Sequence, residues 1–302
     1  MLSDSRQDAL VRAMPAVFVL IWATGFIVAR FGMPHAPPMK FLAVPYFLSV
    51  LCFMAWAWWA RAALPANRRQ FAHLAVTGIL IHAGYLGGVW TAIKLGMGAG
   101  LAALLVSLQP VLTAIWVSSW GGRVTARQWA GLALGFGGLA LVVWHKLGLG
   151  EINGVNLTCA LVALLSITVG TLYQKRFVTP CDVRTANLVQ LGAALAVTLP
   201  IALLETEAIR WEGELIGAMA WSVLGLTLGG SSLLYLLIQR GAATAVTSLL
   251  YLVPPCTALM AWLLFAEPIT ALTLAGMALT AFGVSLVVRA PPAPAANPSA
   301  RR

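Results

Sequence analysis

Long stretches without a charged residue alternate with short charged segments along the whole chain. Ten such windows together cover most of the sequence. They are residues 13–29, 41–60, 70–93, 97–122, 128–145, 152–174, 185–204, 215–239, 241–266 and 268–288. A helix needs about 20 apolar residues to cross the ~30 Å hydrocarbon core of a bilayer. The pattern therefore predicts a polytopic membrane protein with ten transmembrane helices.

The windows indicate helices and not strands. A transmembrane β-strand has about 10 residues that alternate strictly between apolar and polar, whereas these windows are longer and apolar on every side. In lipid, a helix satisfies its backbone hydrogen bonds within itself. We expect an all-α fold with a short N-terminal cytoplasmic segment at 1–12 and a disordered, Pro- and Ala-rich tail at 290–302. The first window lacks a small-x-small cleavage site, so we interpret it as a retained helix and not as a signal peptide.

Composition supports the membrane interpretation and excludes other classes. Only 9% of residues are charged and the mean hydropathy is +0.88, against about 25% charged residues in soluble domains. The net charge of +10 does not indicate nucleic-acid binding, because the basic residues are dispersed over short connections. The four cysteines show no CxxC spacing, so we expect neither a metal site nor a disulfide framework.

The basic residues are distributed unevenly between alternate connections. With the N-terminus in the cytoplasm, that side holds 14 Lys and Arg side chains and the opposite side holds 5. The five are Arg30, Lys40, Lys94, Lys146 and Arg210. This asymmetry satisfies the positive-inside rule for ten helices. We therefore expect both termini in the cytoplasm.

The chain resembles itself at an offset of 145 positions. Residues 125–143 and 270–288 share 10 identities in 19 positions, and the same offset pairs Pro110 with Pro255 without a gap. We expect one five-helix repeat at 13–146 and a second at 147–289. Because five is odd, the second repeat enters the membrane inverted. Inverted repeats are typical of secondary transporters with a midplane site, although a purely structural duplication is an alternative.

Several segments together resemble the drug/metabolite transporter superfamily, in particular its ten-helix EamA-type exporters. The resemblance is carried by Trp22–Phe26, Gly96–Pro110, Gly241–Pro255 and Ala266–Thr270 with the following Gly276 and Gly283. The first half lacks an equivalent of the Glu267–Pro268 pair and has Gly122–Thr125 in its place. The resemblance implies an exporter of small metabolites in a bacterial inner membrane, with amino acids of aromatic or broad preference as the expected substrates. A nucleotide-sugar or drug transporter of the same fold is the alternative.

Polar side chains inside the membrane are costly and tend to mark transport pathways. His82 lies at the centre of window 70–93, and Tyr85 follows on the same helix face. An imidazole beside a phenol can hydrogen-bond the carboxylate of a zwitterion, or the pair can serve as an interhelical hydrogen bond. The full predicted substrate-binding set is Trp22, His82, Tyr85, Trp90, Gln109, Asn187, Gln190, Tyr235 and Tyr251. Side-chain packing is the alternative role for each aromatic member of this set.

Prolines fall near the middle of the fourth and ninth windows. Pro110 and its repeat partner Pro255, with Pro254 beside it, each remove a backbone hydrogen bond. We expect bends at equivalent depths in the two repeats. These bends are either hinges for transport or static features of shape.

No Asp or Glu lies within any window, and Glu267 is expected at the start of the last helix. Carboxylate-driven antiport is therefore disfavoured. Facilitative uniport is the expected mechanism, with proton coupling through His82 as the alternative, since imidazole titrates near neutral pH. No catalytic motif occurs in its required context, so an intramembrane enzyme is a remote alternative. We expect no cofactor and no metal, and the expected partners are a small-molecule substrate and the lipid bilayer, with a monomer as the simplest state.

Overall fold

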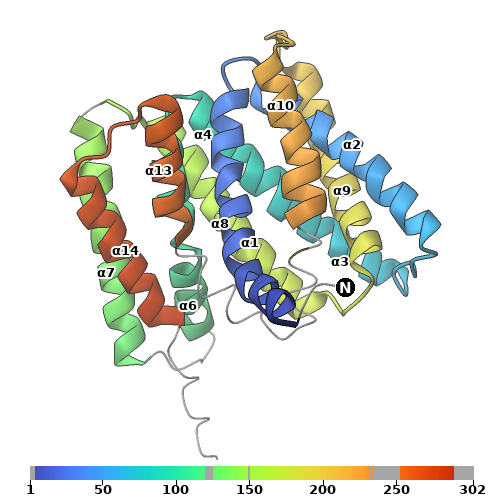
Figure 1. Ribbon diagram of the computed structural model, residues 1–302, viewed down its shortest axis with the longest axis horizontal. Coiled ribbons are helices and arrows are strands. Elements are labelled where there is room, and N and C mark those ends of the chain that lie inside the picture. Colours follow the sequence, from blue (N-terminus) through green and yellow to red (C-terminus); the bar gives the residue numbers. More distant parts are fainter. Residues whose placement is uncertain (1–3, 120–124, 149, 231–232, 234–251, 289–302) are drawn as a thin grey trace, which may run out of the picture.

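The computed structural model describes residues 4–119, 125–148, 150–230, 233 and 252–288, and every regular element within them is a helix (Figure 1). The first group is α1 (Asp4–Gly32), α2 (Pro38–Trp59), α3 (Arg68–Gly78), η1 (Ile79–Leu86), α4 (Gly87–Lys94), α5 (Ala99–Val106), α6 (Gln109–Ser119) and α7 (Ala126–Gly148). The second group is α8 (Gly154–Phe177), α9 (Val183–Leu204), α10 (Gly213–Trp221), η2 (Ser222–Gly230), α13 (Val253–Phe265) and α14 (Ala271–Val288). The expected all-α class is confirmed for these residues.

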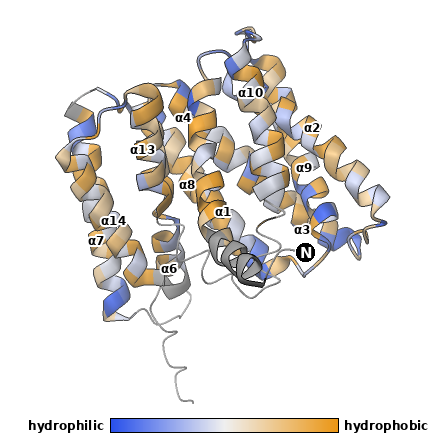
Figure 2. Ribbon diagram, viewed as in Figure 1, coloured by the Kyte–Doolittle hydropathy of each residue, from blue (hydrophilic) through white to orange (hydrophobic). Residues whose placement is uncertain are grey.

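Within the described residues, six helical segments are long and apolar enough to cross a bilayer. They are Pro38–Trp59, Arg68–Lys94, Ala99–Trp116, Ala126–Leu147, Gly154–Phe177 and Val183–Leu204, and shorter apolar helices cover Ala16–Gly32, Val253–Phe265 and Ala271–Val287. Hydrophobic residues line the helices, and hydrophilic residues gather at helix ends and connections (Figure 2). Apolar side chains point outward, as Leu203 and Leu204 do with 76% and 80% exposure. Such a surface suits lipid as the solvent.

Short polar side chains fix the helix starts. The Asn67 carboxamide accepts a hydrogen bond from the Gln70 backbone N–H at 2.8 Å and caps α3. Asn153 and Asn156 form a reciprocal capping box at the start of α8. These caps satisfy backbone donors that have no partner within the helix.

Three of the expected helices are not regular along their length. The segment from α3 to α4 passes through the π-helical η1, and α10 continues into the π-helical η2. The fourth window is interrupted at Ser107–Leu108, so Pro110 is the second residue of α6, and Pro254 and Pro255 lie in the first turn of α13. A first-turn proline removes no helical hydrogen bond. At Pro110, the expected bend in one helix is therefore a break between two.

Helix bounds recur at the offset seen in the sequence. The start and the end of α9 each lie 145 positions after the start and the end of α2. The same offset separates the starts of α3 and α10 and the starts of α7 and α14. It also separates the ends of α1 and α8. The π-helical segments η1 and η2 also lie at nearly matching positions. Irregular geometry thus falls at the same place in both halves of the chain.

Helices related by this offset pack against each other. α2 lies along α9, and α7 lies beside α14 at one edge of the molecule (Figure 1). A Cβ atom on Gly138 would lie 2.5 Å from the Gly276 carbonyl oxygen, and one on Gly131 would lie 2.5 Å from the Gly283 carbonyl oxygen. Residue numbers rise along α7 as they fall along α14, so the two helices are antiparallel. We call this contact the glycine seam.

Candidate functional site

A cavity of about 880 Å³, part of which is open to the surroundings, lies between α1, α2, η1, α4, α9 and η2. Its lining consists of Trp22, Gly25, Phe26, Phe41, Leu42, Pro45, Tyr46, Ile81, His82, Tyr85, Leu86, Trp90, Asn187, Ser222, Leu226 and Thr227. Pockets for small molecules are mainly apolar with a few placed polar groups. The lining of this cavity fits that description.

The π-helix η1 supplies the polar centre of the cavity wall. His82 and Tyr85 both face the cavity from η1. The Tyr46 hydroxyl of α2 donates a hydrogen bond to the His82 carbonyl oxygen at 2.9 Å, and the two rings meet edge to face at 6.1 Å. The Gln190 side chain of α9 lies close to the His82 side chain. Side chains of α2 and α9 thereby border the imidazole.

Close helix contacts hold η1 and α4 from behind. A Cβ atom on Gly88 would lie 2.7 Å from the Cys159 carbonyl oxygen of α8, and one on Gly84 would lie 2.8 Å from the Ser166 hydroxyl. These glycines allow α8 to approach the backbone of this segment. The wall that carries His82 is consequently fixed on the side opposite the cavity.

The second π-helix, η2, forms the facing wall. The Thr227 hydroxyl donates to the Ser222 carbonyl oxygen at 2.8 Å, across the five-residue spacing of a π-helix. Next to this wall, the Trp221 indole N–H donates to the Thr24 hydroxyl of α1 at 2.8 Å. π-Helical segments occur often at functional sites, and here both border one cavity.

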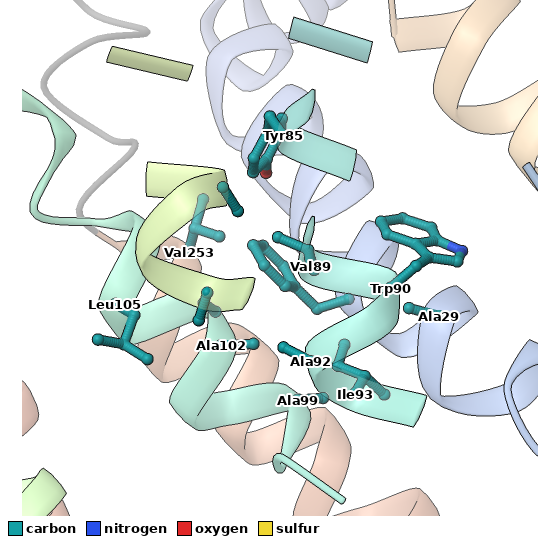
Figure 3. Close-up of a cluster of buried hydrophobic side chains, with 14 of the residues drawn as sticks. Ala29, Tyr85, Val89, Trp90, Ala92, Ile93, Ala99, Ala102, Leu105 and Val253 are labelled. Atoms are coloured by element: carbon teal, nitrogen blue, oxygen red, sulfur yellow. The ribbon is translucent and has the colours of Figure 1, made fainter. Parts of the chain in front are cut away.

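Aromatic rings dominate the remaining surface. Trp90 lies near Phe41, with ring centroids 6.2 Å apart, and Trp22 lies 5.6 Å from Phe18. Tyr85 and Trp90 lie at the edge of a buried cluster that joins α4 to α5 and α13 (Figure 3). The buried Trp90 indole N–H has no hydrogen-bond partner among the described residues.

No charged side chain lines the cavity within the described part of the chain. Its polar groups are phenol, imidazole, amide, hydroxyl and indole. Such a site can hydrogen-bond a ligand and can place aromatic faces against a cation or a ring. From these residues it offers no ion pair to a carboxylate or a phosphate.

Five of the nine predicted substrate-binding residues line this cavity, namely Trp22, His82, Tyr85, Trp90 and Asn187. Gln190 lies behind His82, outside the lining set. Gln109 lies elsewhere, since its amide donates to the Thr171 hydroxyl of α8 at 3.0 Å. Tyr235 and Tyr251 fall outside the residues that the structure describes.

Sequence reasoning missed Tyr46, Phe41, Phe26 and Thr227. The repeat offset carried a signal for one of them, since it relates His82 to Thr227, and both line the cavity. The same offset relates two further pairs of lining residues, Leu42 with Asn187 and Ile81 with Leu226. The aromatic residues of α1 and α2 had no comparable signal, because ordinary packing gives the same composition.

Ion pairs form at the end of the bundle that carries the five basic residues predicted to lie opposite the cytoplasm, which are Arg30, Lys40, Lys94, Lys146 and Arg210. Lys94 pairs with Glu207 at 2.7 Å, and Lys146 pairs with Glu151 at 2.6 Å. Glu267 accepts a hydrogen bond from the Ala99 backbone N–H at 3.2 Å and lies 3.5 Å from Arg30. The expectation for Glu267 is therefore corrected, because its carboxylate caps α5, which approaches it in space, and not the last helix.

At the opposite end, Asp182 caps α9. Its carboxylate accepts hydrogen bonds from the Arg184 guanidinium at 2.6 and 2.9 Å and from the Arg184 backbone N–H. The Arg184 side chain holds the pKa of the Asp182 carboxyl below its ordinary value. This carboxylate is therefore ionised and fully engaged at neutral pH.

Several curated proteins of similar sequence are named as transporters or efflux pumps. The chain is 26% identical over 295 residues to a "Probable amino-acid metabolite efflux pump" of Salmonella typhimurium, covering 94% of this chain and 95% of the other. It is 25% identical over 280 residues to the "Uncharacterized transporter YvbV" of Bacillus subtilis, covering 90% and 89%. A crystal structure of another protein shares the fold, with a TM-score of 0.65 at 17% identity, over 92% of this chain and 96% of that one.

The sequence profile of the EamA-like transporter family matches two consecutive segments, residues 13–144 and 156–289. Together these segments contain every described residue that lines the cavity. The helical architecture and the apolar spans agree with a multi-pass membrane transporter. The chain belongs to the EamA-like transporter family.

Proposed function

We propose that this transporter exports small metabolites, most of all amino acids with an aromatic or broad side-chain preference, through the cavity between η1 and η2. The observation that carries the proposal is the composition of this cavity, in which aromatic rings surround a few uncharged polar groups. A ring-bearing substrate fits between the indole and phenol faces. Its polar end meets His82, Tyr85 and Asn187 as hydrogen-bonding partners.

A zwitterion can be bound here without a charged partner. Aromatic faces attract an ammonium group through cation–π interactions, and phenol, amide and indole N–H or O–H groups donate to a carboxylate. The Trp90 indole N–H, which is unpartnered among the described residues, is one such donor. The name given to relatives in Salmonella typhimurium and Escherichia coli, "Probable amino-acid metabolite efflux pump", agrees with this substrate class.

The architecture that we propose is ten transmembrane helices in two inverted repeats, at 13–146 and 147–289, with both termini in the cytoplasm of a bacterial cell. Three observations support it. Helix bounds recur at the repeat offset, the related helices α7 and α14 run antiparallel, and the family profile matches twice. The excess of Lys and Arg on alternate connections supports the orientation.

Alternating access in this arrangement involves helices of both repeats in each moving unit. α2 packs along α9 and α7 along α14, so each pair takes one helix from each repeat. A movement of one whole repeat against the other would separate both pairs. We therefore place the motion at the cavity, between the wall of η1 and the wall of η2.

Facilitative uniport is the proposed mechanism, since no carboxylate of the described residues lines the cavity. A His82-linked proton antiporter is the second candidate, because the imidazole of His82 is a titratable group in the lining. A nucleotide-sugar transporter fits less well. Its phosphates would require Lys or Arg, and among the described residues none faces the cavity.

Counterflow in proteoliposomes tests the proposal. Vesicles preloaded with unlabelled phenylalanine or tryptophan are expected to accumulate the labelled amino acid, with no change when a pH gradient is imposed. Accumulation that requires a pH gradient and disappears in His82→Gln would overturn uniport. Counterflow of nucleotide sugars without any amino-acid counterflow would overturn the substrate class.

A further inference from the structure

The connection between α2 and α3 forms a corner at the right of the molecule in Figure 1. The Thr185 hydroxyl of α9 donates to the Ala63 carbonyl oxygen at 2.9 Å, and Asn67 caps α3. The Ala62 backbone N–H donates a hydrogen bond to the Ala57 carbonyl oxygen at 2.8 Å, at the C-terminal end of α2. Arg61 there takes a left-handed conformation with φ of 47°.

Two grooves run on either side of this corner, with the Leu64 side chain between them. The first has a volume of about 1220 Å³ and includes Trp58 and Arg61 in its walls. The second has a volume of about 1230 Å³ and includes Arg68, Phe71 and Gly192. Both volumes include open space at the mouth, and both grooves share the α9 residues Thr185 and Leu188 as a floor.

The chemistry of the corner divides into cationic and apolar parts. Arg61, Arg68 and Arg69 are exposed, and none of them forms an ion pair with another described residue. The nearby acidic cap, Asp182, is already engaged by Arg184. Trp58 and Leu64 are 83% and 79% exposed. Guanidinium groups bind phosphates through paired hydrogen bonds, and exposed tryptophans are typical of the membrane interface.

We propose that this corner is a binding site for one anionic phospholipid of the adjacent leaflet. The two acyl chains lie in the two grooves on either side of Leu64. The phosphate lies between Arg61 and Arg68, with Arg69 adding positive charge. Charge complementarity and the paired grooves select a two-chain anionic lipid over a zwitterionic one. The inference needs the helices to lie in a bilayer and is independent of the transported substrate.

Native mass spectrometry of the purified full-length chain with phosphatidylglycerol and phosphatidylcholine tests the headgroup preference. The wild type is expected to retain phosphatidylglycerol, and Arg61→Gln/Arg68→Gln/Arg69→Gln to lose that preference by at least about fivefold, the effect of one juxtamembrane arginine. The matched control, Arg127→Gln/Lys175→Gln/Arg176→Gln, removes the same charge from α7 and α8. It is expected to keep the preference. Equal loss in both triple variants would overturn a defined site, as would a wild type without headgroup preference.

A second pair of variants tests the grooves. No described atom lies within 4 Å of a Cβ atom built on Gly192 or on Gly217, so leucine at either position leaves the fold intact. Gly192→Leu fills one groove and is expected to reduce phosphatidylglycerol binding, whereas Gly217→Leu on α10 is not. Inorganic phosphate at millimolar concentration is expected to leave the lipid bound. Displacement by phosphate, or equal binding in the two leucine variants, would contradict the role of the acyl grooves.

Discussion

The glycine seam between α7 and α14 and the cavity between η1 and η2 show two opposite ways to pack membrane helices. At the seam, backbones approach so closely that a Cβ atom on Gly138 would lie 2.5 Å from the Gly276 carbonyl oxygen. At the cavity, aromatic side chains line a space of about 880 Å³ that is open in part to the surroundings. The difference lies in side-chain size at the facing positions.

In a bilayer there is no hydrophobic force that brings helices together, since lipid is as apolar as leucine. Small residues are therefore used where helices must stay together, and close backbone contact supplies the attraction. Bulky aromatic residues are used where a space must remain. The two regions predict opposite responses to the same substitution, glycine to leucine.

The largest effect is expected from Gly138→Leu in the seam. The new side chain would meet the Gly276 carbonyl oxygen at 2.5 Å and the Thr280 hydroxyl at 2.6 Å, so α7 and α14 must separate. We expect a loss of about 3 kcal/mol or more in the free energy of unfolding. Thermal unfolding in detergent and the yield of monodisperse protein measure it. The neighbouring Gly137 has no described atom within 4 Å, and Gly137→Leu is expected to behave as wild type. An equal loss of stability in both variants would contradict the close packing of α7 against α14.

The next effect is expected from Gly25→Leu, which places the same side chain at the cavity wall. A Cβ atom on Gly25 meets Leu226 at 3.8 Å, an ordinary contact, so the fold tolerates it. The leucine occupies space required by the substrate. We expect binding to weaken roughly 10- to 100-fold, which is about 1.4–2.8 kcal/mol, with an unchanged melting temperature. A variant that melts early would show that this wall is packed like the seam.

A smaller effect is expected from removing the imidazole of the cavity. His82→Gln keeps a hydrogen-bonding group, so under uniport the affinity falls by less than about tenfold, the worth of one hydrogen bond, and the pH profile keeps its shape. His73→Gln on α3 is the matched control, because His73 is hydrogen-bonded to Tyr173 away from the lining. A pH profile that flattens only in His82→Gln would favour proton coupling.

The smallest effect is expected at a site outside both regions. Asp182→Asn preserves the cap of α9 but removes the ion pair with Arg184, which is worth under about 1 kcal/mol. Because the pKa of folded Asp182 is lowered, its contribution is present above pH of about 4 and is lost as the pH falls through the lowered pKa. Melting temperatures of variant and wild type should therefore converge in acid. A constant difference down to a pH of about 2 would exclude the ion pair as the cause.

The positions of the six long apolar segments followed from charge-free windows, because apolar length is the physical requirement for crossing a bilayer. The π-helices η1 and η2 did not follow from the sequence. A shift from four- to five-residue hydrogen bonding changes neither composition nor hydropathy. The break before Pro110 was misread as a bend for a similar reason, since a proline pattern does not say whether the helix before it continues.

Contacts between helices were the part least accessible to sequence reasoning. Aligning the repeats equates Gly131 with Gly276, yet in space Gly131 meets Gly283, as antiparallel packing requires. His82, Tyr85 and Trp90 stood out as polar or aromatic groups within one window. Tyr46 did not, because its role depends on the approach of α2 to His82. The repeat offset was the sequence feature that linked the two π-helical walls, because it relates His82 of η1 to Thr227 of η2.

Equilibrium binding of labelled phenylalanine and tryptophan to the purified protein tests the central claim, that the cavity between η1 and η2 is the substrate site. We predict saturable binding in the wild type and in Gly137→Leu, and a loss of roughly 10- to 100-fold in the folded Gly25→Leu variant. Binding to Gly25→Leu with wild-type affinity would contradict the claim.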